Sequence, residues 1–229
     1  MYSIDELPLQ DLQNFWSLLY MDFCRKICTD HPAEGETVIR RAIAETGRRQ
    51  GDWQRQEHEQ MGLNTNLHSF FLDGRGAVCD PRSAAAVHTR NTEVCLWDRY
   101  ICPMANYWAA HSAEAYGRFY CEEYMRAFLS GYTGGKGQFH LSKVLTDKRD
   151  ILCQFAAYFR PANLELEQRR KAFESTPVRQ EVPVGSFSDY IREKAVLFCA
   201  FLCAELKEAF GNAGLLSFAD ALHSFEQES

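Results

Sequence analysis

The sequence lacks the features that mark nucleic-acid-binding, secreted and membrane-spanning chains. Its 229 residues carry 31 acidic against 25 basic side chains, without a polybasic tract, so a surface that follows phosphates is not expected. The start has no basic region followed by an apolar segment. No run of about 18 uncharged apolar residues could span a bilayer. We therefore expect a cytoplasmic protein that binds neither nucleic acid nor membrane.

Cysteine, in contrast, is abundant. The chain has nine cysteines, but the odd number and the missing secretory signal indicate reduced thiols rather than a disulfide framework. Two pairs, Cys24 with Cys28 and Cys199 with Cys203, share helical faces and could each offer two metal ligands. Their surroundings are apolar, so we interpret them as core residues. No cofactor is expected.

Apolar residues recur at helical spacing at both ends of the chain. Helices are predicted over 7–27, 33–60 and 187–210, with a last helix to about residue 225. Hydrophobic residues make up 46% of the sequence, enough for one sizeable core. The predicted fold class is α+β, with helices packed on a small antiparallel sheet and helical segments at the N- and C-terminal ends.

The middle of the chain contains the strand signals. Residue type and alternation predict a strand over 92–100 and a hairpin of two strands over 138–145 and 151–159. Residues 73–91, which contain Gly74, Gly76 and Pro81, are predicted to form a long loop.

Glycine and serine mark features of the predicted helices. Gly47 and Gly51 interrupt the second helix, where glycine costs about 1 kcal/mol, so they indicate a close backbone approach or a kink. A later helix is predicted from residue 113, with Ser112 as its cap and Gly131 as its end.

The chain divides into two parts by composition. Residues 1–162 are predicted to form an α+β domain. After a connector at 177–186, residues 187–229 form C-terminal helices that pack on the same core. The apolar helix 187–210 can also seal a homo-oligomer.

The stretch YCEEY, residues 120–124, raises the first question of chemistry. Helical spacing turns Cys121 inward. Glu122 lies at the apolar border, where a carboxyl pKa can rise enough for proton transfer near neutrality. The alternative is a surface glutamate that pairs with Arg118 or Arg126.

A second thiol lies in the predicted hairpin. If the turn has five residues, Lys143 opposes Cys153, and its ammonium would lower the pKa of that thiol. Alternatively, Lys143 reaches water along its alkyl stem. Because Cys121 and Cys153 both lie on apolar faces, we expect the helix to pack on the hairpin and the two thiols to share a wall of the core.

Segments spread over residues 35–160 follow one another in a characteristic order and spacing. They read RRAIAETGRRQG, CPMANYWAAHSAEAYGRFYCEEYMRAFLSGY, SKVL and CQF. Together they resemble the L-2-amino-thiazoline-4-carboxylic acid hydrolase family. The resemblance implies a hydrolase-like domain over 1–162 that opens a small cyclic isothiourea, the 2-aminothiazoline ring, to give N-carbamoyl-L-cysteine.

The resemblance also implies roles for matching residues. Cys121 or Cys153 would attack the ring carbon between nitrogen and sulfur, or Glu122 would deprotonate a water. Lys143 would activate Cys153 or hold the substrate carboxylate. The residues expected to bind the small-molecule substrate are Cys102, Asn106, Trp108, Tyr120 and Tyr132.

Two other functions stay open. Tyr124 and Gln154 stand where the family pattern has aspartates, and the loss of these carboxylates favours a non-catalytic small-molecule-binding protein on the same scaffold. The other alternative is a metal-binding protein whose ligands are Cys102, Cys121 and Cys153 with His111 or His140.

Overall fold

The chain folds as the α+β protein that the sequence predicts. The structure is a computed structural model that describes residues 8–71, 80–173 and 187–228. None of the helices in these ranges has the length and hydrophobicity needed to cross a bilayer. The described elements, in chain order, are α1 Leu9–Asp30, α2 Gly35–Gln60, α3 Leu67–Phe70, β1 Ala84–Arg90, β2 Val94–Ile101, α5 Pro103–Ala110, α6 Glu114–Tyr132, β3 Gln138–Lys143, β4 Cys153–Tyr158, the 3-10 turn η2 Pro161–Asn163, α7 Leu166–Phe173, α8 Phe187–Phe210 and α9 Asn212–Glu228.

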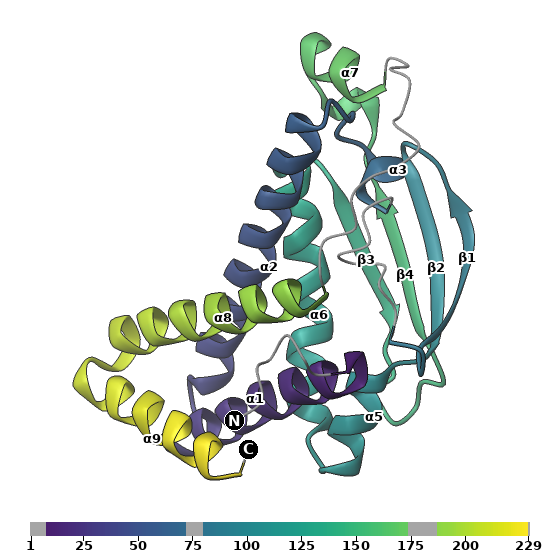
Figure 1. The fold of residues 1–229 in the computed structure, drawn as a ribbon. Coiled ribbons are helices and arrows are strands. Elements are labelled where there is room, and N and C mark those ends of the chain that lie inside the picture. The colour runs from purple at the N-terminus through teal and green to yellow at the C-terminus, as the bar shows by residue number, and fades with distance from the viewer. Residues whose placement is uncertain (1–7, 72–79, 174–186, 229) are drawn as a thin grey trace.

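The strands form one antiparallel sheet in the order β1-β2-β4-β3. Figure 1 shows the long helices α2 and α6 on one side of this sheet. The Trp97 ring stacks on Phe155 at 4.8 Å between centroids and meets Phe71 edge-on at 5.2 Å. These rings pack into the same apolar cluster as the helices, so one face of the sheet closes the core.

Glycines let α2 and α6 approach closely. A Cβ on Gly51 would lie 2.0 Å from the carbonyl oxygen of Phe128, and one on Gly47 would lie 2.5 Å from a carbonyl oxygen of α6. In the opposite direction, a Cβ on Gly131 would lie 2.0 Å from the Arg48 carbonyl oxygen. No side chain fits at such distances. The close backbone approach predicted at Gly47 and Gly51 is confirmed.

The helices α1, α8 and α9 extend the same core. The Trp16 and Tyr20 rings of α1 lie 5.7 and 5.3 Å from Phe198 of α8, and Leu202 one turn further is fully buried. Gly211 separates α8 from α9, as predicted, with a left-handed backbone at φ +60° that glycine adopts without strain.

The region before β2 differs from the prediction. Residues 73–91 were expected to form a loop, but Ala84–Arg90 form β1 and pair with β2. Residues 72–79 lie outside the described part, as does the predicted connector at 177–186. The strand is missing from the prediction because it lies at the sheet edge, where Val87 is 58% exposed and apolar alternation is weak.

The ends of α6 also differ. Ser112 was expected to cap the helix, but it adopts φ 53°, and Ala113 takes the N-cap position without a side-chain hydrogen bond. Gly131 was expected to end the helix, which instead continues to Tyr132. Gly131 is instead one of the points where the backbones of α2 and α6 approach closely.

Candidate functional site

Thiols from separate elements converge between the sheet and α6. Cys102 is the N-cap residue of α5, Cys121 lies within α6, and Cys153 opens β4. Electrostatic interactions link Cys121 to both other thiols, and Cys153 to Cys102. The prediction that Cys121 and Cys153 share a wall of the core is confirmed, and Cys102 joins them there.

Burial keeps two of these thiols protonated. It raises the pKa of Cys121 well above its usual value, and the neighbouring thiols add to that effect. Burial raises the pKa of Cys153 to about 11, although the backbone N–H of Leu145, which donates to its sulfur at 3.3 Å, acts in the opposite direction. Near neutral pH both are weak nucleophiles, since the thiolate is the reactive form. All eight cysteines in the described ranges are free thiols.

Arg99 of β2 brings a positive charge to the thiols. It lies directly across from Cys153 in the β2–β4 ladder, and its charge opposes the rise in the pKa of both Cys153 and Cys121. Its Nη1 donates to the Ser83 hydroxyl at 2.9 Å. Within the part of the chain that the structure describes, Arg99 has no ion pair with a carboxylate, so the guanidinium can accept an anion from outside the chain.

A lysine is buried beside the same thiols. Lys194 of α8 is only 3% exposed, and its Nζ donates to the Tyr120 hydroxyl at 3.1 Å. The distances from Nζ to the surrounding ring centroids run from 4.3 to 5.5 Å, for the rings of Trp16, Tyr120, Tyr124 and Tyr190. No described carboxylate pairs with it. The rings solvate the ammonium only in part.

The aromatic surroundings change the acidity of this lysine. Burial lowers the pKa of Lys194 to about 7, and the nearby Cys102 acts against that shift. At neutral pH the amine is therefore present in both its charged and its neutral form. Lysines with such a pKa can accept and donate protons in catalysis.

Hydrogen bonds hold the aromatic rings around Lys194 in place. The Tyr124 hydroxyl donates to Gln50 Oε1 at 2.6 Å and lies 2.7 Å from the Tyr190 hydroxyl. The Gln50 side chain in turn donates to the Tyr190 backbone at 3.3 Å. Burial raises the pKa of Tyr190 to about 12 and that of Tyr124 well above its usual value, so both stay neutral phenols.

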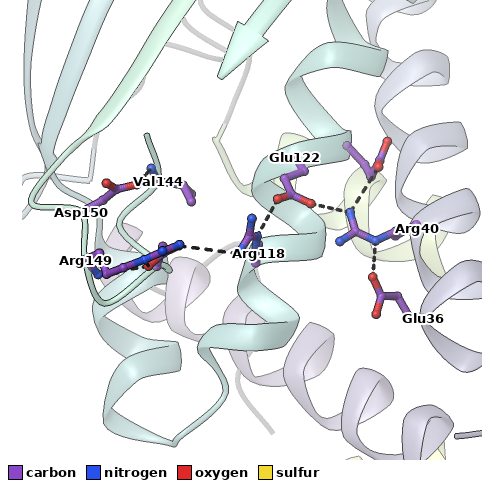
Figure 2. Close-up of polar contacts among 9 residues, drawn as sticks. Glu36, Arg40, Arg118, Glu122, Val144, Arg149 and Asp150 are labelled. Carbon is purple, nitrogen blue, oxygen red and sulfur yellow. Dashed lines mark hydrogen bonds and ion pairs between the residues drawn. The ribbon is translucent and has the colours of Figure 1, made fainter. Parts of the chain in front are cut away.

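Glu122 is held by arginines instead of facing an apolar border alone. Figure 2 shows its carboxylate pointing between Arg118 and Arg40, which donate at 2.6 and 2.7 Å. Burial acts to raise the pKa of Glu122, but these two hydrogen bonds outweigh it, and the pKa is lowered. The predicted rise in pKa is wrong. The alternative, an ion pair with Arg118, is confirmed.

Lys143 does not oppose Cys153. The β3–β4 register shifts after Leu141, which pairs with Phe155, so that Lys143 pairs with Gln154. The side chain of Lys143 is exposed. The predicted pairing with Cys153 is wrong because an irregularity in the ladder moves the strand by one residue, which a count of turn residues cannot reveal.

The residues predicted to bind substrate do not all lie together in the structure. Cys102 and Tyr120 belong to the thiol and lysine cluster. Trp108 lies beside Tyr120 at 5.7 Å between centroids, but it is fully buried and its Nε1 donates to the Ser17 carbonyl at 3.0 Å. Asn106 is exposed.

Tyr132 lies at the C-terminal end of α6. Twelve residues separate it from Tyr120, which corresponds to about 18 Å along a helix. Its hydroxyl lies 2.7 Å from His58 Nδ1. It therefore cannot contact a small ligand bound at Tyr120.

The predicted metal ligands do not form a site. Among the residues that the structure describes, no group of three or more histidine, cysteine, aspartate or glutamate side chains is placed to hold a metal ion. His111 stacks on Tyr107 at the end of α5, and His140 lies on β3 against Tyr158. The cysteine and histidine arrangement inferred from sequence is therefore wrong.

Sequence reasoning missed both cations of the cluster, although each leaves a signal. Lys194 lies three residues after Ile191 and four before Phe198, on the apolar stripe of α8. Arg99 lies on the same face of β2 as the buried Cys95 and Trp97 and is itself half-buried. A charged residue at a position where periodicity demands an apolar one is such a signal.

Thiols, a buried amine and a guanidinium thus meet between the sheet, α6 and α8. This set can supply a sulfur nucleophile, a proton carrier and an anion-binding group. No protein-family model, curated protein or solved structure matches this chain.

Proposed function

We propose that the protein is a thiol-dependent hydrolase that opens a small cyclic amidine, such as 2-aminothiazoline-4-carboxylate, to an N-carbamoyl amino acid. The observation that carries the proposal is the position of Cys102, at the start of α5, where it interacts electrostatically with the buried Lys194. The substrate class comes from the resemblance of residues 35–160 to the aminothiazoline carboxylate hydrolases.

Cys102 is the nucleophile in this proposal. Its side chain caps no backbone N–H of α5, and Pro103 occupies the first turn, so no helix N–H holds this buried sulfur. Cys121 and Cys153 are kept protonated by burial and serve as walls of the site.

The reaction proceeds by addition and ring opening. The Cys102 thiolate attacks the amidine carbon between nitrogen and sulfur, and the carbon–sulfur bond of the ring breaks. Water then attacks the same carbon, its oxygen becomes the carbonyl of the N-carbamoyl product, and Cys102 leaves as a thiolate. Arg99 binds the substrate carboxylate, for which a guanidinium offers two parallel hydrogen bonds.

The experiment is turnover of 2-aminothiazoline-4-carboxylate by purified protein, with detection of N-carbamoyl-cysteine. Cys102→Ser should lower kcat/KM by about two to four orders of magnitude. Cys203→Ser, at a half-buried cysteine of α8, is the matched control and should leave the rate unchanged. Saturable binding without turnover would refute hydrolysis and favour a non-catalytic carrier.

A further inference from the structure

We propose that Lys194 is the acid–base residue of this site, which takes the proton of the Cys102 thiol and later gives it to the departing ring sulfur. The second half of this inference rests on the proposed function. The first half concerns only the protein and can be tested without turnover.

Geometry supports the assignment. Lys194 is 3% exposed and makes a hydrogen bond to Tyr120, and Cys102 acts electrostatically on both residues. No carboxylate of the described residues holds it in the charged form. A buried lysine with such surroundings loses its proton easily, and burial lowers its pKa to about 7.

The groups around Lys194 leave it as the residue that titrates near neutrality. Its phenolic neighbours have raised pKa values and stay neutral. Arg99 acts on Tyr120 and Tyr190, and Glu193, the residue before Lys194, acts on Tyr124 and Tyr190. The titratable or charged groups on the surrounding elements are Tyr120, Tyr124 and Cys121 from α6, Tyr190 and Glu193 from α8, Arg99 from β2, and Cys102 from the start of α5.

The proton balance closes over one cycle. Neutral Lys194 accepts the Cys102 proton, giving an ammonium beside a thiolate. When the ring opens, the ammonium protonates the departing sulfur and becomes an amine again. In the second step the amine takes one proton from the attacking water and returns it to Cys102 as that sulfur leaves, while the other water proton passes to the amidine nitrogen as the carbonyl forms.

The test is alkylation by iodoacetamide of the folded protein between about pH 6 and pH 9, with modification of Cys102 measured by peptide mass spectrometry. The wild-type rate should rise through about pH 7, where Lys194 loses its proton. Lys194→Met should remove this rise and lower the rate near pH 8 by about tenfold or more. Lys143→Met, at an exposed lysine, is the control and should change neither the alkylation rate of Cys102 nor its pH dependence.

A second variant keeps Lys194 and destabilises its protonated form. Tyr120→Phe removes the hydroxyl that accepts a hydrogen bond from the ammonium, so it disfavours the charged form. The midpoint of the rise should then move to lower pH. The same displacement should appear in the pH profile of kcat/KM for 2-aminothiazoline-4-carboxylate.

The outcomes separate this inference from the proposed function. A Lys194→Met protein whose Cys102 reacts with the rate and pH dependence of wild type would overturn the inference, as would a wild-type Cys102 that does not react. Alkylation that depends on Lys194, in a protein that does not turn over a cyclic amidine, would support the acid–base pair and refute only the substrate.

Discussion

Lys194 and Tyr120 lie 74 residues apart in the sequence and form a hydrogen bond of 3.1 Å in the interior of the protein. The bond joins α8 to α6 at the point where aromatic rings of α1, α6 and α8 surround the lysine. A neutral hydroxyl does not replace the hydration of a buried ammonium. The charged form of Lys194 therefore destabilises the fold.

The stability of the protein should reveal this cost through its pH dependence. The pKa of Lys194 falls from 10.5 to about 7 on folding, so between these values the unfolded chain holds one proton more than the folded chain. The free energy of unfolding should then rise by about 1.4 kcal/mol per pH unit above pH 7. Below pH 7, the charged form of Lys194 should lower the free energy of unfolding by about 5 kcal/mol. Urea denaturation of wild type and Lys194→Met at several pH values measures the difference.

Lys194→Met should be the more stable protein near pH 6, and its advantage should shrink as the pH rises towards 9. Lys143→Met serves as the control, because an exposed lysine contributes no such slope. Parallel curves for wild type and Lys194→Met would show that Lys194 is not neutral in the folded protein.

The contact between α2 and α6 should tolerate no side chain at Gly51. Gly51→Ala would place a Cβ 2.0 Å from the Phe128 carbonyl oxygen, so the helices must separate. The expected loss is about 2–4 kcal/mol of unfolding free energy, although alanine favours the helix by about 1 kcal/mol. Arg41→Ala, on the exposed face of α2, should change stability by less than about 0.5 kcal/mol. Equal stability of Gly51→Ala and wild type would disprove the close approach.

Glu122 should matter for stability and little for catalysis. Glu122→Gln removes ion pairs to Arg118 and Arg40 that are partly exposed, so the loss should be about 0.5–1 kcal/mol. Because the pKa of Glu122 is lowered from 4.5 on folding, its contribution is complete above that value and disappears as the pH falls through the folded value. A large loss of kcat with unchanged stability would instead assign a catalytic role to Glu122.

Arg99 should determine the preference for a carboxylate. Arg99→Gln is expected to raise KM for 2-aminothiazoline-4-carboxylate by about tenfold to a hundredfold, since it removes a charged hydrogen-bond donor. KM for the corresponding carboxamide should change little. Arg99→Lys keeps the positive charge but loses the two parallel N–H donors of the guanidinium, so its KM should lie between those of wild type and Arg99→Gln. Equal effects on both compounds would place the carboxylate elsewhere.

Much of the fold follows from local patterns in the sequence. Periodicity predicts the long helices, and the glycines at 47 and 51 indicate where two of them touch, because a missing Cβ has a direct steric meaning. The strand β1 was not predicted, since an exposed edge strand has no buried face to impose alternation. The shift near Lys143 depends on pairing between strands, which no single strand encodes.

The candidate site was predicted only in part. Cys121 and Cys153 were placed correctly because each lies on the apolar face of its element. The role of Glu122 was not settled, because Arg40 approaches it from α2, 82 residues away. The role of Lys194 is not predicted because a single lysine within an apolar stripe interrupts the pattern, and only the packing of three helices around it shows that it is buried.

The most direct test of the thiol and lysine site is to trap the covalent intermediate. Wild-type protein mixed with excess 2-aminothiazoline-4-carboxylate, quenched with acid and digested, should give a peptide in which Cys102 carries the mass of the whole substrate, because ring opening by addition loses no atom. Cys102→Ser should give no adduct, and Cys121→Ser should still give it. An adduct on Cys121 or Cys153, or turnover without any adduct in wild type, would contradict the assignment of Cys102 as the nucleophile.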